Sequence, residues 1–224
     1  MDNGDLVWSS PTKPDASVRA EGERRPESSD SSIPGVTIRT LNPNDLDNLR
    51  QLDKLLFPVT YSDSFYHNLL ANPNLNRVAV NADREIVGCV TCRYVRYKQY
   101  GRSVWVSTIP QCVGYISTLG VSPNYRRRGL GKRLLEIALE ELSKECNTVI
   151  LHVKADNTAA IQLYLNAGFV RVKYLPNHYL FDNQYHDAIQ LQRGQCDTIH
   201  SLDSALDHED DGSWLSWAPR CTIF

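Results

Sequence analysis

The strongest constraint on this chain is a short basic, glycine-containing segment that lies between a strand pattern and a helix pattern. Its residues are Arg126, Arg127, Arg128, Gly129, Leu130, Gly131 and Lys132. Glycine lets the backbone approach a ligand closely, and the first turn of a helix presents N–H groups that have no partner within the helix. Those donors, the helix dipole and the surrounding positive charge together predict an anion site suited to a pyrophosphate.

A nucleotide-binding loop of the common types and a nucleic-acid patch both fit this segment less well. The phosphate-binding patterns GxxxxGK[ST] and GxGxxG do not occur in it. A basic patch can also bind nucleic acid, but the chain has a net charge of −2 and a pI of about 6.3, which argue against a surface built for nucleic acid. The strand before the segment and the amphipathic helix after it favour a phosphate cradle, so we expect no nucleic-acid partner.

Composition divides the 224 residues into three parts. Residues 1–34 are rich in serine, proline and charge and lack apolar periodicity, so they are predicted to be disordered. Residues 35–193 carry strand and helix patterns throughout and predict one domain. Residues 194–224 carry an excess of acidic side chains and are predicted to form a flexible tail.

The central domain alternates between the two kinds of secondary-structure pattern. The expected helices cover 46–56, 63–70, 125–146 and 157–167. The expected strands cover 36–41, 77–80, 85–95, 113–119, 148–153, 169–174 and 187–191. The order β-α-α-β-β-β-α-β-α-β-β predicts a mixed α/β (α+β) domain.

Two motifs together resemble the GCN5-related N-acetyltransferases (GNAT). Residues 126–131 fit the R/Q-x-x-G-x-G/A loop with which that family holds the pyrophosphate of acetyl-CoA, and residues 157–169 fit its second CoA segment, N-x-A-A-I-x-L-Y-x-x-x-G-F. The resemblance covers about residues 36–191. It implies one acetyltransferase domain with a mixed, mostly antiparallel sheet flanked by helices, and acetyl-CoA as co-substrate. The implied cofactor residues are Leu119, Gly120, Val121, residues 126–132, Asn157 and Tyr164.

Three further segments resemble the N-terminal protein acetyltransferases of the NatE and NatF type. They are the Phe57-Pro-Val-Thr-Tyr61 turn, residues 115–120 (YISTLG) and residues 151–153 (LHV). The resemblance implies that Tyr115 and His152, on neighbouring strands, act on the substrate amine. The implied peptide-site residues are Phe57, Pro58, Val59, Tyr61, Ser117 and Tyr179. It leaves open which of the two types this chain follows.

The hairpin near residue 178 departs from this family pattern. The NatE and NatF enzymes carry a Tyr-Tyr pair there, whereas this chain has Asn177, His178 and Tyr179. We expect these three residues in the loop of a β-hairpin. The departure concerns the peptide pocket and its preference, because the chemistry depends on other residues.

The chemistry of amine acetylation agrees with the implied catalysts. An α-ammonium, with a pKa of about 7.7–8.0, must lose a proton before it can attack a thioester. A histidine is a suitable acceptor near neutral pH, a tyrosine can assist it, and such a base contributes about 10²–10⁴-fold. Without the family pattern, a lone Tyr115 or His152 in an apolar strand is more often a core residue than a catalyst. We therefore predict direct acetyl transfer to the α-amine of protein N-termini, chiefly those that begin with methionine.

Two alternatives to this function stay open. The same fold could acetylate lysines or small amines, or the chain could be a weakly catalytic acetyl-CoA-binding subunit of a larger complex. Apart from its protein substrates, we expect other acetyltransferase subunits or the ribosome as partners.

The cysteines and the chain ends predict the compartment. No apolar run reaches the roughly 18 residues of a transmembrane helix, and the first residues lack a secretory signal pattern. We therefore expect a cytoplasmic protein whose six cysteines are reduced. Cys89 and Cys92 form a CxxC on a strand, where residues three apart point to opposite faces, so we expect structural thiols and no metal site.

The last four residues, Cys221-Thr-Ile-Phe224, fit a prenylation pattern. One prenyl chain gives only marginal membrane binding, but Trp214 and Trp217 could add an interfacial anchor. Contact with the cytosolic face of a membrane is one expectation. The alternative is a chance cysteine in a flexible tail.

Overall fold

The computed structural model describes residues 33–97 and 111–194 of the chain, all of which belong to one compact unit. The predicted disordered segment and acidic tail, including Cys221, lie outside the described residues except at their inner ends. Within the described ranges, no helix is long and apolar enough to cross a membrane.

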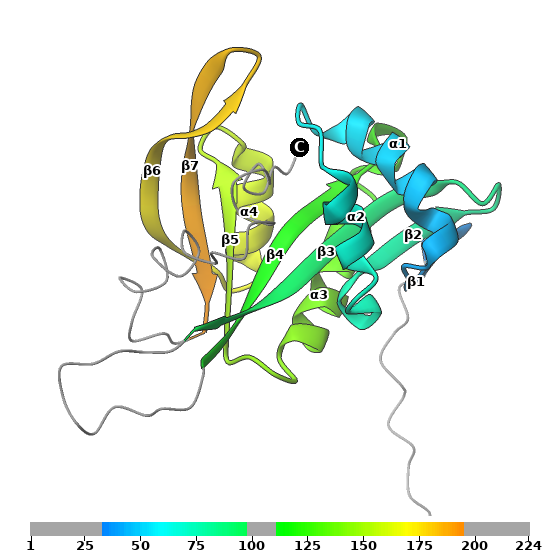
Figure 1. Ribbon diagram of the computed structural model, residues 1–224, viewed down its shortest axis with the longest axis horizontal. Helices are drawn as coiled ribbons and strands as arrows, with labels where there is room; N and C mark the ends of the chain where they lie inside the picture. The colour runs from blue at the N-terminus through cyan, green and yellow to red at the C-terminus, as the bar shows by residue number, and fades with distance from the viewer. Residues whose placement is uncertain (1–32, 98–110, 195–224) are drawn as a thin grey trace, which may run out of the picture. The chain divides into compact units, whose positions relative to one another are not determined.

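Seven strands form one sheet in the order β1-β2-β3-β4-β5-β7-β6 (Figure 1). Their bounds are β1 Val36–Thr40, β2 Arg77–Asn81, β3 Ile86–Tyr97, β4 Gln111–Val121, β5 Thr148–Lys154, β6 Val170–Phe181 and β7 Gln184–Arg193. All neighbouring strands are antiparallel except β4 and β5. The expected element order and the mixed, mostly antiparallel sheet are confirmed.

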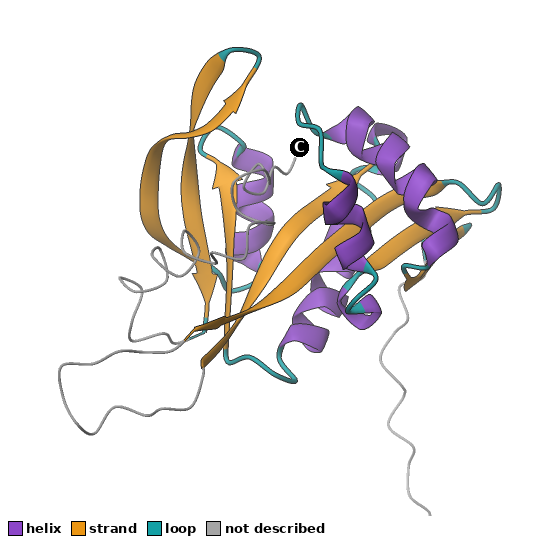
Figure 2. Cartoon of the chain, in the orientation of Figure 1, coloured by secondary structure: helices purple, strands orange, loops and turns teal. Residues whose placement is uncertain are grey.

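Four α-helices cover the two faces of this sheet (Figure 2). They are α1 Leu46–Leu56, α2 Asp63–Leu69, α3 Leu130–Leu142 and α4 Thr158–Asn166. The buried residues form two clusters, one with α1 and α2 and the other with α3 and α4. Val78 and Ala79 are successive residues of β2 but belong to different clusters, so the two helix pairs pack on opposite faces of the sheet.

The third helix begins five residues later than predicted. Residues Pro123–Tyr125 form a short 3-10 turn, and α3 starts only at Leu130. Between them, Arg127 and Gly129 adopt left-handed φ angles of 60° and 84°. A helix cannot continue through left-handed residues, so the basic segment stays an open loop in front of α3.

The β6–β7 hairpin also differs from the prediction. β6 runs on to Phe181, and the turn is formed by Asp182 and Asn183, both with positive φ, as a two-residue hairpin turn requires. Residues 177–179 therefore lie in a strand and not in the hairpin loop. The sequence of this stretch is typical of a loop, because Pro176 has no N–H and asparagine is common in turns. In the structure Asn177 has a φ of 53°.

The expectation that all cysteines are reduced is wrong for one pair. Cys112, at the start of β4, is joined by a disulfide to Cys146, which follows α3, with their Cα atoms 5.1 Å apart. Helix α3 returns the chain to the start of β4, a long-range contact that the sequence pattern does not display. Cys89 and Cys92 are free and buried, and they belong to the clusters on opposite faces of the sheet, as strand alternation predicts.

Candidate active site

The site is built where the only parallel strand pair of the described sheet opens. β4 and β5 are in register from Val113 and Thr148 to Tyr115 and Ile150. Beyond those residues β4 runs on to Val121 and β5 to Lys154, and the two strands diverge (Figure 1). Backbone groups and side chains at both carboxyl ends therefore border one opening in the sheet.

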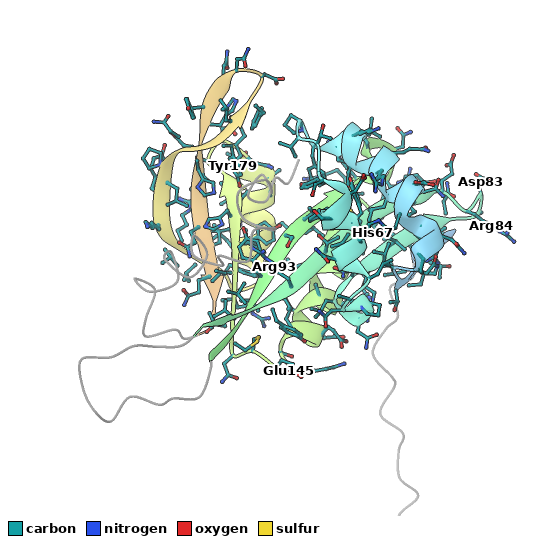
Figure 3. The ribbon with its side chains drawn as sticks, in the orientation of Figure 1. His67, Asp83, Arg84, Arg93, Glu145 and Tyr179 are labelled. Carbon is teal, nitrogen blue, oxygen red and sulfur yellow. A yellow bond between two sulfur atoms is a disulfide. The ribbon has the colours of Figure 1, made fainter. Side chains whose placement is uncertain are left out.

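Tyr115 and His152 meet across this opening. The Tyr115 hydroxyl and His152 Nδ1 are 2.9 Å apart, which is a hydrogen bond whose direction depends on the histidine tautomer. Both side chains are buried. Arg93 comes from the neighbouring strand β3 (Figure 3). Its guanidinium lies over the Tyr115 ring, with Cζ 4.8 Å from the ring centroid. A phenol and an imidazole in this contact can share or pass one proton.

A β-bulge at Ser117 directs Tyr115 away from the α3 side of the sheet. The β3–β4 register passes from Thr91–Thr118 to Cys92–Ile116 and leaves Ser117 as the extra residue. Ile116 and Leu119 consequently share the cluster beneath α3, although they are three residues apart. Tyr115 is the neighbour of Ile116 and points to the other face. Ser117 itself is half-buried at the opening.

The basic loop is shaped by its backbone, and two of its arginines support it. Gly129 precedes α3 with a φ of 84°, and its missing side chain leaves the first turn of the helix without a side-chain cap. Arg126 Nε donates to the Val121 carbonyl at 3.0 Å and ties the loop to β4. Arg128 lies over the Tyr125 ring, 5.3 Å from Cζ to centroid. The first turn of α3 thus has no side-chain cap and follows a loop that carries three arginines, two features that an anion site needs.

The remaining predicted cofactor residues, from the end of β4 and the basic loop, differ in what they can offer a ligand. Leu119 and Leu130 have core side chains, so only their backbone is available. A Cβ on Gly120 would lie 2.5 Å from Leu56 Cδ1, so this glycine is required by the packing of α1 against β4. A Cβ on Gly131 would make ordinary contacts of 3.7 and 3.8 Å. Lys132 is exposed and lines a groove between α3 and α4, and its Nζ lies 3.8 Å from Glu136 Oε1.

The second predicted CoA segment forms α4. Asn157 is the N-cap of this helix, and its Oδ1 accepts from the Ala160 N–H at 3.1 Å. Tyr164 is fully buried, with its ring edge-on to Phe169 at a centroid distance of 5.5 Å. Both residues therefore hold α4 in place, and their contact with acetyl-CoA stays a prediction.

The Phe57–Tyr61 turn is held by an aromatic cluster. Phe57 and Tyr61 are buried, and the Tyr61 ring stacks on Phe65 at 4.4 Å and meets Phe57 edge-on at 6.1 Å. Pro58 is exposed and Val59 half-buried. The cluster fixes the turn, and Pro58 and Val59 present its surface.

A buried carboxyl beside this turn was missed by the sequence analysis. Asp53 of α1 is 2% exposed and accepts from the Tyr66 hydroxyl at 3.0 Å. Burial, as the main cause, raises the pKa of Asp53 to about 7, so this carboxyl changes charge near neutral pH. Its position relative to Leu49, Leu52 and Leu56 places it on the apolar face of α1, which was a usable signal.

His178 lies against the predicted catalytic histidine. Its ring centroid is 4.8 Å from that of His152 and 4.9 Å from that of Tyr179. Tyr179, labelled on the hairpin in Figure 3, is buried. The sequence predicted a role for Tyr179 but none for His178; the structure brings Tyr115, His152, His178 and Tyr179 together in one row of contacts.

The fold and this site define a class of CoA-dependent acyltransferases. A family model described as the acetyltransferase (GNAT) family matches residues 46–169. The chain belongs to this family, and acetyl-CoA is its acyl donor.

The chain is similar to known acetyltransferases with different names. It is 33% identical to "Histone acetyltransferase MCC1" of Arabidopsis thaliana over 70% of this chain and 69% of that protein. It is 31% identical to "N-alpha-acetyltransferase 60" of Danio rerio over 79% of this chain and 80% of that protein. Among solved structures, Arabidopsis thaliana Naa50 in complex with the bisubstrate analogue CoA-Ac-MVNAL is 29% identical with a TM-score of 0.60, over 72% of this chain and 99% of that one.

Proposed function

We propose that this acetyltransferase modifies the free α-amine of protein N-termini, and that Tyr115 and His152 remove the proton from that amine. The observation that carries the proposal is the 2.9 Å contact between the Tyr115 hydroxyl and His152 Nδ1 at the opening between β4 and β5. The end of β4 borders this opening and leads into the basic loop. The proposed acetyl-CoA site and the proposed site of the substrate amine therefore lie along the same strand.

The proposed reaction needs no covalent enzyme intermediate. The α-ammonium gives a proton to the Tyr115–His152 pair, directly or through water, and the neutral amine attacks the acetyl carbonyl of the thioester. The new C–N bond forms, the C–S bond breaks, and the CoA thiolate leaves and takes up the proton that the acylated nitrogen releases. Holding amine and thioester together supplies much of the rate, and the base adds about 10²–10⁴-fold.

The basic loop is suited to the pyrophosphate of acetyl-CoA. The uncapped first turn of α3 offers N–H donors to an anion, and Arg127, Arg128 and Lys132 add positive charge around it. Arg126, which is bound to the Val121 carbonyl, supports the loop from β4.

For the peptide we propose a preference for an N-terminal methionine. Pro58 and Val59 offer an apolar surface on a turn that the aromatic cluster keeps rigid, and a flexible thioether suits such a surface. The similar Naa50 structure carries an analogue whose peptide begins with methionine. Tyr61 and Tyr179 are proposed to contact the peptide backbone, and Ser117 to border it.

A second candidate function is lysine acetylation, because the similar Arabidopsis protein carries the name of a histone acetyltransferase. The two functions differ in the amine that enters the site. Peptides that carry only one of the two amines therefore distinguish them.

The proposed catalysts are tested by His152→Ala and Tyr115→Phe. We expect His152→Ala to lower kcat by about 10²–10⁴-fold and Tyr115→Phe to lower it substantially, because each removes one member of the proton-accepting pair. Acetyl-CoA affinity, measured by calorimetry, should stay close to wild type in both variants. Normal kcat values in both would remove the pair from the mechanism.

A further inference from the structure

One carboxylate on β7 holds the irregular part of β6. Asp187 Oδ1 accepts from the Asn177 N–H at 2.8 Å, and Oδ2 accepts from the Tyr174 hydroxyl. The main-chain carbonyl of the same residue accepts from the Ala155 N–H at 2.9 Å, which ties this point of β7 to the end of β5. We call these contacts of Asp187 with Tyr174 and Asn177 the Asp187 clasp.

The irregular stretch needs such a support. Between the register pairs Leu175–Ala188 and Tyr179–His186, β6 advances four residues while β7 advances two. Pro176 has no N–H to give to the sheet, and Asn177 has a left-handed φ of 53°, which costs most residues about 1–2 kcal/mol. The ordinary ladder of the sheet is therefore interrupted here, and the clasp replaces part of it.

The clasp depends on the negative charge of Asp187. The hydrogen bonds from Tyr174 and from the Asn177 backbone hold the pKa of the Asp187 carboxyl below its usual value. The carboxylate is therefore ionised across the neutral pH range, and hydrogen bonds to an ionised acceptor are the stronger kind.

The residues that follow the clasp are the ones that reach the site. His178 comes directly after Asn177, and its ring lies 4.8 Å from that of His152. Tyr179 comes next and is buried, whereas Tyr174 on the other side of the bulge is 57% exposed. The bulge thus turns two side chains of an edge strand toward the active site.

We propose that Asp187 is a positioning residue for peptide recognition, whose carboxylate fixes the β6 bulge and so holds His178 and Tyr179 in the wall of the peptide site beside His152. This inference rests on the proposed function, because it concerns the peptide that the proposed reaction uses. According to this inference, Asp187 affects the binding of the peptide, and it affects neither the binding of acetyl-CoA nor the proton transfer.

The test is steady-state kinetics of Asp187→Ala in the full chain, with acetyl-CoA and a methionine-initiated peptide. The substitution removes the acceptor of both clasp hydrogen bonds, which are exposed to solvent. We therefore expect the peptide KM to rise only about tenfold, while kcat changes less than about threefold and the acetyl-CoA KM is unchanged. Asp187→Asn keeps an oxygen for the Asn177 N–H and should restore most of the affinity. Tyr174→Phe removes one donor and should raise the peptide KM by less than Asp187→Ala does.

The matched control is Asp83→Ala, an exposed aspartate in the β2–β3 turn at the other end of the sheet (Figure 3). Its kinetic constants should equal those of the wild type. Wild-type peptide KM in Asp187→Ala, or a fall in kcat at unchanged peptide KM, would overturn the inference. If Asp187→Ala does not fold, Tyr174→Phe decides, and a wild-type peptide KM in that variant overturns the inference. An inactive wild-type enzyme would instead overturn the proposed function, and the inference with it.

Discussion

The basic loop before α3 and the proposed peptide wall are built in different ways. The loop owes its shape to a few successive residues, above all Gly129 with its left-handed φ. The peptide wall combines a turn after α1 with a bulge in β6. The turn packs against Gly120 of β4, and the bulge places His178 against His152 of β5, so both depend on contacts between segments far apart in the chain. A site for a constant cofactor can thus be encoded locally, whereas a wall for variable peptides depends on long-range packing.

The largest expected effect concerns the packing that supports the peptide wall. It is predicted for Asp53 of α1, the buried carboxyl beside the Phe57–Tyr61 turn. The pKa of Asp53 lies near 7 in the folded protein but near 4 in an unfolded chain, so folding binds a proton between these values. Stability should therefore fall as pH rises from about 4 to 7, by a few kcal/mol in total. Urea unfolding at pH 5 and pH 8 should show this loss in the wild type and a much smaller one in Asp53→Asn.

Equal pH dependence in wild type and Asp53→Asn would show that another group causes the loss. Asp47→Asn is the matched control, because Asp47 is also on α1 but exposed. Its pH dependence should follow that of the wild type.

The next largest effect is predicted for Gly120, which links the cofactor loop and the peptide wall. Gly120 lies in the strand that leads to the loop, yet a Cβ there would meet Leu56 Cδ1 at 2.5 Å and Phe57 Cζ at 3.1 Å. Gly120→Ala should destabilise the protein by about 1–3 kcal/mol and raise the peptide KM, since α1 must move to make room. Thermal unfolding and peptide kinetics measure both changes. An effect confined to the acetyl-CoA KM would assign Gly120 to the cofactor site alone.

The smallest effect tests whether the shape of the basic loop depends on Gly129 alone. Gly129→Ala forces a side chain into a left-handed conformation, which costs about 1–2 kcal/mol, and should raise the acetyl-CoA KM up to about tenfold. Gly35→Ala is the matched control, because Gly35 also has a left-handed φ, of 76°, and open space around it, but lies outside the loop. Its acetyl-CoA KM should equal that of the wild type, and at saturating acetyl-CoA neither substitution should change the peptide KM. A wild-type acetyl-CoA KM in Gly129→Ala would show that the left-handed glycine does not shape the cofactor site.

The same contrast explains what the sequence could predict. All seven strands and four helices follow from local apolar periodicity, and their order was predicted correctly. The sequence analysis placed the start of α3 too early. The apolar periodicity of the helix does not reveal that left-handed residues precede its first turn. The motif residues of the loop were found because they are contiguous.

Long-range features were the ones that the sequence did not reveal. The Cys112–Cys146 pair depends on where α3 returns the chain, and the contact of His178 with His152 depends on a bulge that looks like a loop. Asp53 carried a local signal, its place on the apolar face of α1. Its unusual pKa, however, comes from burial beneath β3 and α2, which only the tertiary structure shows.

The most direct test of the central claim is acetyl transfer to two matched peptide series. One series has free α-amines, varied first residues and no lysine, and the other has blocked α-amines and one internal lysine. We predict transfer from acetyl-CoA to the free α-amines alone, fastest when the first residue is methionine. Transfer only to the blocked, lysine-containing peptides would contradict this prediction and assign the enzyme to the lysine acetyltransferases of the same family.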